Sequence, residues 1–172
     1  MSKSAIVFIS DIHYCKDEEH SQFKKNDDNE YYQKWENCIA GIEKNDDVKI
    51  KYLVISGDLV ETAKRKEYEI IGNILNRFCK KFKILKENVL LIPGNHDINR
   101  SNLEVYCDKN NIEEVDAATC YEEKLDNYID FYKKFKGKEN FDASKAILDS
   151  IEIQAEEVLI LGLNSLVKES FS

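Results

Sequence analysis

Three polar clusters, each directly after a run of apolar residues, carry the side chains best suited to chemistry in this chain. The first contains Asp11 and His13, the second contains Asp58, and the third is the segment 94–97, which reads Gly-Asn-His-Asp. Carboxylate, amide and imidazole groups without a thiolate suit Mn²⁺, Fe, Zn²⁺ or Mg²⁺ as ligands. The clusters therefore predict a site for divalent metal ions.

The residues of this predicted site suit the hydrolysis of a phosphoester. Asp58 has two carboxylate oxygens and can bridge two ions, and Asn95 offers a neutral carbonyl oxygen. Two ions about 3.5–4 Å apart hold the phosphoryl oxygens and lower the pKa of a water that bridges them. We expect the resulting hydroxide to attack phosphorus in line.

Residues of the third cluster and just after it are candidates for catalysis and for substrate binding. We expect His96 to protonate the leaving alkoxide or to stabilise its charge, with a role in supporting a metal ligand as the alternative. Asp97 is expected to orient His96. Arg100 is a candidate for holding a phosphate through two hydrogen bonds, although a surface salt bridge explains it nearly as well. Together with Asn95, His96 and Arg100 are the candidate substrate-binding residues.

The elements that position these clusters alternate between strands and helices. Continuous apolar runs predict buried strands at 5–10, 52–56 and 88–93, and apolar residues at helical spacing predict helices at 30–43 and 62–83. This order predicts a parallel sheet that is covered on both faces. Ligand sites of such sheets lie beyond the carboxyl ends of the strands, where the three clusters would meet.

The pattern changes after residue 100. Apolar and aromatic residues at helical spacing predict one amphipathic helix over 117–135. The segments 150–154 and 158–164 flank a short turn at 155–157 and predict a β-hairpin.

The motifs D-x-H at 11–13, GD at 57–58 and GNHD at 94–97, each after a hydrophobic strand, resemble those of the calcineurin-like metallophosphoesterase family. The resemblance covers residues 4–100 strongly and the hairpin weakly. It implies a four-layer α/β/β/α sandwich, and two divalent ions with Mn²⁺ as the first expectation. By resemblance, Asp11, His13 and Asp58 hold one ion, Asp58 and Asn95 hold the second, and His96 contacts the substrate.

The chain departs from the family after the third motif. The family completes its site with one later histidine and then a G-H-x-H pair, whereas this chain has only His13, His20 and His96. We therefore expect residues 1–172 to form a single truncated domain, which contains the first sheet, its helices and the start of the second sheet. On this hypothesis the fragment alone is inactive, its partner is the missing half or a further domain, and an apolar edge or face near 158–163 is uncovered.

Composition limits the classes of function. The net charge of −8 argues against strong nucleic-acid binding through the phosphate backbone. Five cysteines without a CxxC motif predict reduced thiols, some of them in the core. The sequence shows neither a signal peptide nor a run long enough to span a membrane, so we expect a cytoplasmic location and no membrane partner.

Two hypotheses of different kinds remain. The first is an enzyme that hydrolyses a phosphomonoester or phosphodiester, with a nucleotide or a nucleic-acid-type molecule as one class of substrate. The alternative is a non-catalytic scaffold or interaction module that keeps the fold. The intact D-x-H, GD and GNHD motifs favour the enzyme, because a scaffold does not require all of them.

Overall fold

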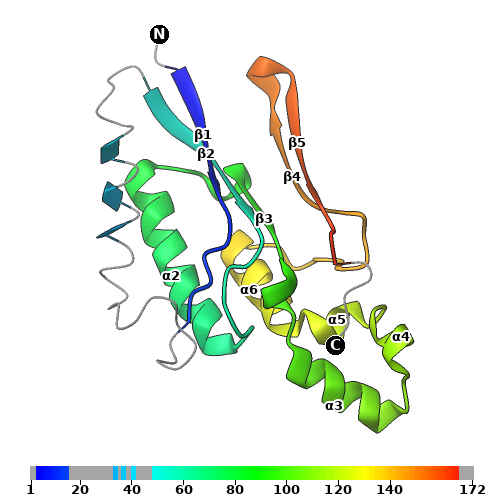
Figure 1. The fold of residues 1–172 in the computed structure, drawn as a ribbon. Helices are drawn as coiled ribbons and strands as arrows, with labels where there is room; N and C mark the ends of the chain where they lie inside the picture. Colours follow the sequence, from blue (N-terminus) through cyan, green and yellow to red (C-terminus); the bar gives the residue numbers. More distant parts are fainter. Residues whose placement is uncertain (1–2, 16–32, 35, 38–39, 42–47, 167–172) are drawn as a thin grey trace.

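A three-stranded parallel sheet lies at the centre of the computed structural model, which describes residues 3–15, 33–34, 36–37, 40–41 and 48–166. The strands run in the order β1 (Lys3–Ile9), β2 (Val48–Ser56) and β3 (Val89–Ile92) (Figure 1). All three predicted strands are therefore confirmed, and β2 begins earlier than expected. Because the strands are parallel, their carboxyl ends lie at the same edge of the sheet.

Two helices cover one face of this sheet. They are α2 (Arg65–Phe82), which confirms the helix predicted over 62–83, and α6 (Asp126–Lys136). The fully buried Leu53 and Leu91 of the sheet belong to the same apolar core as Leu75 of α2 and Tyr128 of α6. Burial of large apolar side chains between the two layers is the main force that fixes the helices on the sheet.

A β-hairpin covers part of the opposite face, as Figure 1 shows. Its strands β4 (Ile147–Ile153) and β5 (Val158–Leu163) are antiparallel and are joined by the 3₁₀ turn η3 (Gln154–Glu156), so the predicted hairpin is confirmed. Val54 and Leu90 of the sheet pack with Ile151 and Ile153 of the hairpin in a second apolar cluster. The result is a mixed α/β fold with a helical layer, a parallel sheet and a second β layer.

The outer face of this hairpin remains apolar and exposed. Leu159, Leu161 and Leu163 alternate along β5 and are 58%, 44% and 59% exposed. On the first sheet, Phe8 of β1 is 65% exposed. The expected uncovered apolar face near 158–163 is therefore confirmed.

The segment that follows the third motif forms a small helical unit with its own apolar cluster. It contains α3 (Arg100–Asn110), α4 (Glu114–Ala117) and α5 (Tyr121–Lys124), and Leu103 and Cys107 are buried within it. The prediction of one continuous helix over 117–135 is wrong, because the chain leaves the helical conformation at Cys120 and again at Leu125.

Tertiary hydrogen bonds explain this break. The backbone carbonyl of Lys124 accepts a hydrogen bond from the backbone N–H of Asn99 at 2.8 Å. The fully buried side chain of Lys124 donates to the carbonyl oxygens of Ala118 and Leu166. Asn99 and Leu166 lie far from Lys124 in the sequence, so the apolar spacing alone did not reveal these contacts.

A buried ion pair covers the outer edge of β3. The carboxylate of Asp149 on β4 accepts a hydrogen bond from the backbone N–H of Leu91 at 3.1 Å, and Lys136 of α6 donates to the carbonyl of Val89. The Lys136 ammonium and the Asp149 carboxylate lie 3.1 Å apart, and both are almost completely buried. Two side chains thus satisfy backbone groups that a neighbouring strand would otherwise pair.

Some predictions concern residues that the structure covers only in part. The described residues within 30–43, namely 33–34, 36–37 and 40–41, are helical, whereas Tyr31, Trp35, Ile39, Ile42 and His20 lie outside the described residues. The described cysteines, Cys15, Cys79, Cys107 and Cys120, are all free thiols, as expected. Among the described helices, none has the length and apolar character that crossing a membrane requires.

Candidate metal centre

The first two motifs are joined because parallel pairing continues beyond the ends of β1 and β2. The backbone N–H of His13 donates to the carbonyl of Asp58 at 2.9 Å, and Tyr14 forms an isolated bridge with Val60. The N–H of Glu61 donates in turn to the carbonyl of Tyr14 at 3.0 Å. This short extension of the sheet brings His13 next to both Asp58 and Glu61.

Left-handed backbone conformations mark the residues of these two motifs. Asp11, His13 and Asp58 have φ values of 55°, 45° and 51°. Residues other than glycine adopt this region rarely, and such positions concentrate at functional sites. The conformation turns the chain sharply at each strand end, which brings side chains two residues apart toward a common point.

The third motif docks on the second through two glycines. A Cβ atom on Gly94 would collide with the Asp58 carboxylate, and a Cβ on Gly57, whose φ is +97°, would lie 2.9 Å from Gly94 Cα. The close approach allows the backbone N–H of His96 to donate to Asp58 Oδ1 at 2.8 Å. Glycine at both positions is thus required for the contact between these two loops.

The side chains of Asp11, His13 and Asp58 form a cradle that fits one metal ion. His13 Nε2 lies 3.9 Å from Asp11 Oδ1 and 3.9 Å from Asp58 Oδ2. Nitrogen and oxygen ligands about 2.0–2.2 Å from one ion lie within about 4.4 Å of each other, so these separations match a shared ion. The structure therefore brings together the three ligands expected for the first ion.

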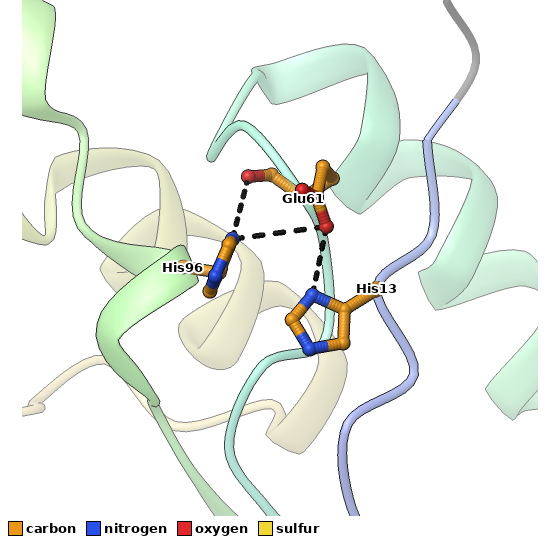
Figure 2. Close-up of side chains that lie close together, drawn as sticks. All are labelled: His13, Glu61 and His96. Carbon is orange, nitrogen blue, oxygen red and sulfur yellow. Dashed lines mark hydrogen bonds and ion pairs between the residues drawn. The ribbon is translucent and has the colours of Figure 1, made fainter. Parts of the chain in front are cut away.

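Glu61 connects this cradle to the third motif (Figure 2). Its Oε2 atom lies 2.7 Å from His13 Nδ1 and 3.7 Å from His96 Nδ1, and its carbonyl oxygen lies 3.1 Å from His96 Nδ1. The two imidazole rings meet edge to face, with centroids 4.5 Å apart. His13, Glu61 and His96 thus form a second group with ligand atoms close enough for a metal ion.

Glu61 was not among the site residues predicted from the sequence. A signal for it was present, because Glu61 follows Asp58 by three residues in the segment Gly-Asp-Leu-Val-Glu. What the sequence did not reveal was the pairing of Tyr14 with Val60, which places Glu61 beside His13.

Asp97 does not have the position that was expected for it. Its side chain is 1% exposed and accepts hydrogen bonds from the Tyr68 hydroxyl at 2.8 Å and from the backbone N–H groups of Gly94 and Leu59. The partner of the His96 ring is Glu61 instead, so the prediction that Asp97 orients His96 is wrong. The buried Asp97 carboxylate accepts hydrogen bonds from both the loop after β2 and the loop after β3, and so it holds these two loops together.

Burial changes the pKa of Asp97. Loss of solvent raises the pKa of this carboxyl to about 6, although the hydrogen bonds from Gly94, Tyr68 and Leu59 oppose the shift. Burial, together with the adjacent Asp97 carboxylate, also raises the pKa of Tyr68 well above its ordinary value.

The other two predicted site residues line a cavity of about 310 Å³ beside the cradle. Asn95 is exposed, and its neighbour His96 is the residue that contacts Asp58. Arg100, the first residue of α3, is partly buried and lines the same cavity.

A parallel sheet with carboxylate and imidazole side chains gathered at its carboxyl edge, backed by a second β layer, is the arrangement expected of a metal-dependent phosphoester hydrolase. The model of the calcineurin-like phosphoesterase family matches residues 4–166, and the chain belongs to that family. The resemblance found in the three motifs is thus confirmed. Membership supports metal-dependent hydrolysis of phosphoesters in general terms.

A relative is found in Acanthamoeba polyphaga mimivirus, the uncharacterized protein R555. It is 37% identical over 106 residues, which represent 59% of this chain and 7% of the relative. The chain therefore spans only a small part of that relative's length. No solved structure matches the chain significantly.

Proposed function

We propose that this protein hydrolyses a phosphomonoester or phosphodiester with two divalent ions, Mn²⁺ being the preferred metal. The observation that carries the proposal is the position of His13 Nε2, 3.9 Å from a carboxylate oxygen of Asp11 and 3.9 Å from one of Asp58, with the His96 ring beside it. Residues that only cap the end of a strand would not require three potential ligands at this spacing together with a second imidazole.

The ligands divide between the two ions through Asp58. Asp11, His13 and Asp58 would hold the first ion, and Asp58 and Asn95 would contribute to the second. When bound, such ions polarise the phosphoryl oxygens and lower the pKa of a water molecule. No histidine follows His96 in the chain, so the imidazoles with which the family completes the second site are not among residues 97–172.

His96 is the residue that we assign to proton transfer. Its Nδ1 atom lies 3.1 Å from the Glu61 carbonyl oxygen, an acceptor that holds a proton on this nitrogen. In the imidazolium form, Nε2 then carries the proton that the leaving oxygen needs. The Glu61 carboxylate lies beside the same nitrogen, with its Oε2 atom 3.7 Å from His96 Nδ1.

The proposal is tested first by metal binding. We expect residues 1–172 to bind one Mn²⁺ ion tightly in calorimetric titration, and Asp58→Ala to abolish this binding because the shared ligand is lost. Asp108→Ala, a change of an exposed aspartate on α3, is the matched control and is expected to bind like the wild type. Equal binding by Asp58→Ala and the wild type would remove the metal assignment.

Turnover is tested on the natural gene product with bis-p-nitrophenyl phosphate and Mn²⁺. We expect metal-dependent release of p-nitrophenol from it, loss of this activity in Asp58→Ala, and negligible turnover by residues 1–172 alone. Metal binding without any turnover of monoester and diester substrates by the gene product would favour the alternative, a scaffold that keeps the fold.

A further inference from the structure

The cavity beside the candidate metal centre is polar and of limited size. It is shared by Asn95 and His96 of the third motif and by Asn99, Arg100 and Ser101 of the following segment. A volume of about 310 Å³ lies at the lower end of the range for small-molecule sites, so it suits a compact group. Apart from the His96 ring, its described lining has no aromatic side chain, and it therefore lacks a platform on which a base would stack.

Arg100 is the cation of this cavity. Its side chain is partly buried, and within the part of the chain that the structure describes, no carboxylate or other acceptor engages its guanidinium. A partly buried charge without a partner is unfavourable. The planar guanidinium presents parallel N–H donors that match a phosphate, so an anion from the substrate would satisfy it.

The residues that line this cavity are distinct from the three residues of the cradle. The reacting group belongs with the cradle of Asp11, His13 and Asp58, none of which lines the cavity, whereas Arg100, the first residue of α3, does line it. Glu61 also lines the cavity, and its carboxylate, which is hydrogen-bonded to His13 at 2.7 Å, is the negative charge there that the Arg100 guanidinium must offset.

We propose that Arg100 and this cavity form a subsite for a second phosphate group, so that the preferred substrates carry another phosphate close to the phosphoester that is cleaved. This inference rests on the proposed phosphoesterase function and defines a class of substrate within it. A substrate with a single phosphorus atom leaves the guanidinium without a partner, whereas a substrate with two occupies both positions.

The first test measures binding without metal or turnover. Inorganic phosphate is titrated into metal-free protein at low ionic strength, and the backbone amide signals of residues 99–101 are followed by NMR. We expect saturable shifts in the wild type, their loss in Arg100→Gln, and their retention in Arg65→Gln, a matched change of an exposed arginine on α2. Absence of saturable shifts in the wild type, or their persistence in Arg100→Gln, would overturn the subsite.

The second test measures substrate preference in the natural gene product. Thymidine 5′-(p-nitrophenyl phosphate) and its 3′-phosphorylated form have the same scissile ester and differ only in one phosphate. We expect the wild type to prefer the second by about 10–100-fold in kcat/KM, the scale of hydrogen bonds to a charged group. Arg100→Gln should remove this preference, and Arg65→Gln should keep it.

The outcomes distinguish this inference from the proposed function. Metal-dependent turnover of both substrates at equal kcat/KM would support the phosphoesterase and refute the subsite. Phosphate binding that depends on Arg100, without turnover of either substrate, would support the anion site and refute the phosphoesterase.

Discussion

The Nδ1 atom of His13 lies 2.7 Å from the Oε2 atom of Glu61, and this contact defines how the histidine can bind a metal ion. A carboxylate accepts a hydrogen bond, so the proton of the neutral imidazole resides on Nδ1 and the lone pair of Nε2 is free. Nε2 is the atom that faces Asp11 and Asp58. Glu61 thus prepares His13 as a metal ligand, although it lies outside the three motifs from which the site was predicted.

The first prediction concerns the effect of Glu61 on metal binding by His13. We expect Glu61→Gln to weaken Mn²⁺ binding by about 10–100-fold, the usual effect of removing a carboxylate that supports a ligand histidine. Glu69→Gln, a change of an exposed glutamate on α2, is the control. Calorimetry measures the affinity, and ¹⁵N chemical shifts of His13 report the tautomer. Unchanged affinity together with an unchanged tautomer would show that the contact has no such role.

The second prediction separates proton transfer from metal binding. His96→Ala in the natural gene product should lower turnover by about 10²–10⁴, the scale of general-acid catalysis, while the number of bound metal ions stays near that of the wild type. Steady-state kinetics and metal analysis on the same sample measure the two effects. His20→Ala is the control, since His20 lies in a charged segment outside the motifs. If His96→Ala instead loses metal in proportion to activity, His96 is a ligand.

The third prediction tests the corrected role of Asp97. Asp97→Ala leaves the Tyr68 hydroxyl and the N–H groups of Gly94 and Leu59 without their acceptor. Because unsatisfied buried donors cost about 1–3 kcal/mol each, we expect the free energy of unfolding to fall by about 3 kcal/mol in metal-free protein. Urea unfolding measures it, with the exposed Asp130→Ala as the control. A stability equal to that of the wild type, with turnover lost, would restore the catalytic role.

The sequence was sufficient for features that depend on local patterns. The strands around Leu53 and Leu91 and the hairpin around Ile151 were predicted, because continuous apolar runs between turn residues identify buried strands. The meeting of Asp11 and His13 with Asp58 was also predicted, because parallel strands deliver their carboxyl ends to one edge of the sheet.

Features that depend on distant partners were not predicted. The helix expected over 117–135 is broken by a hydrogen bond from Asn99 to Lys124. Glu61 lies beside His13 because the loops that follow β1 and β2 continue to pair through the bridge between Tyr14 and Val60. Asp97 was expected to orient its neighbour His96. Adjacent side chains in a tight turn point in different directions, however, and the carboxylate of Asp97 faces the core.

The last prediction concerns the buried pair of Lys136 and Asp149 at the edge of β3. Removing one partner of a buried ion pair leaves an uncompensated charge and typically costs about 3–5 kcal/mol. We expect Asp149→Ala to reach this range. The change leaves the Lys136 ammonium without its counter-ion and also removes the acceptor of the Leu91 N–H. Lys136→Met should cost less, since the Lys138 ammonium, 3.9 Å from Asp149, still faces the remaining carboxylate.

Urea unfolding of the two single variants and of the double variant measures the coupling between these side chains. The double variant should be no less stable than Asp149→Ala, because it leaves no unpaired charge even though Val89 and Leu91 lose their side-chain partners. Glu152→Ala, an exposed change on the same strand, should alter stability by less than about 0.5 kcal/mol. A loss in Lys136→Met larger than in Asp149→Ala would contradict this account, because it would mean that the Val89 contact, and not the Asp149 carboxylate, secures the edge of β3.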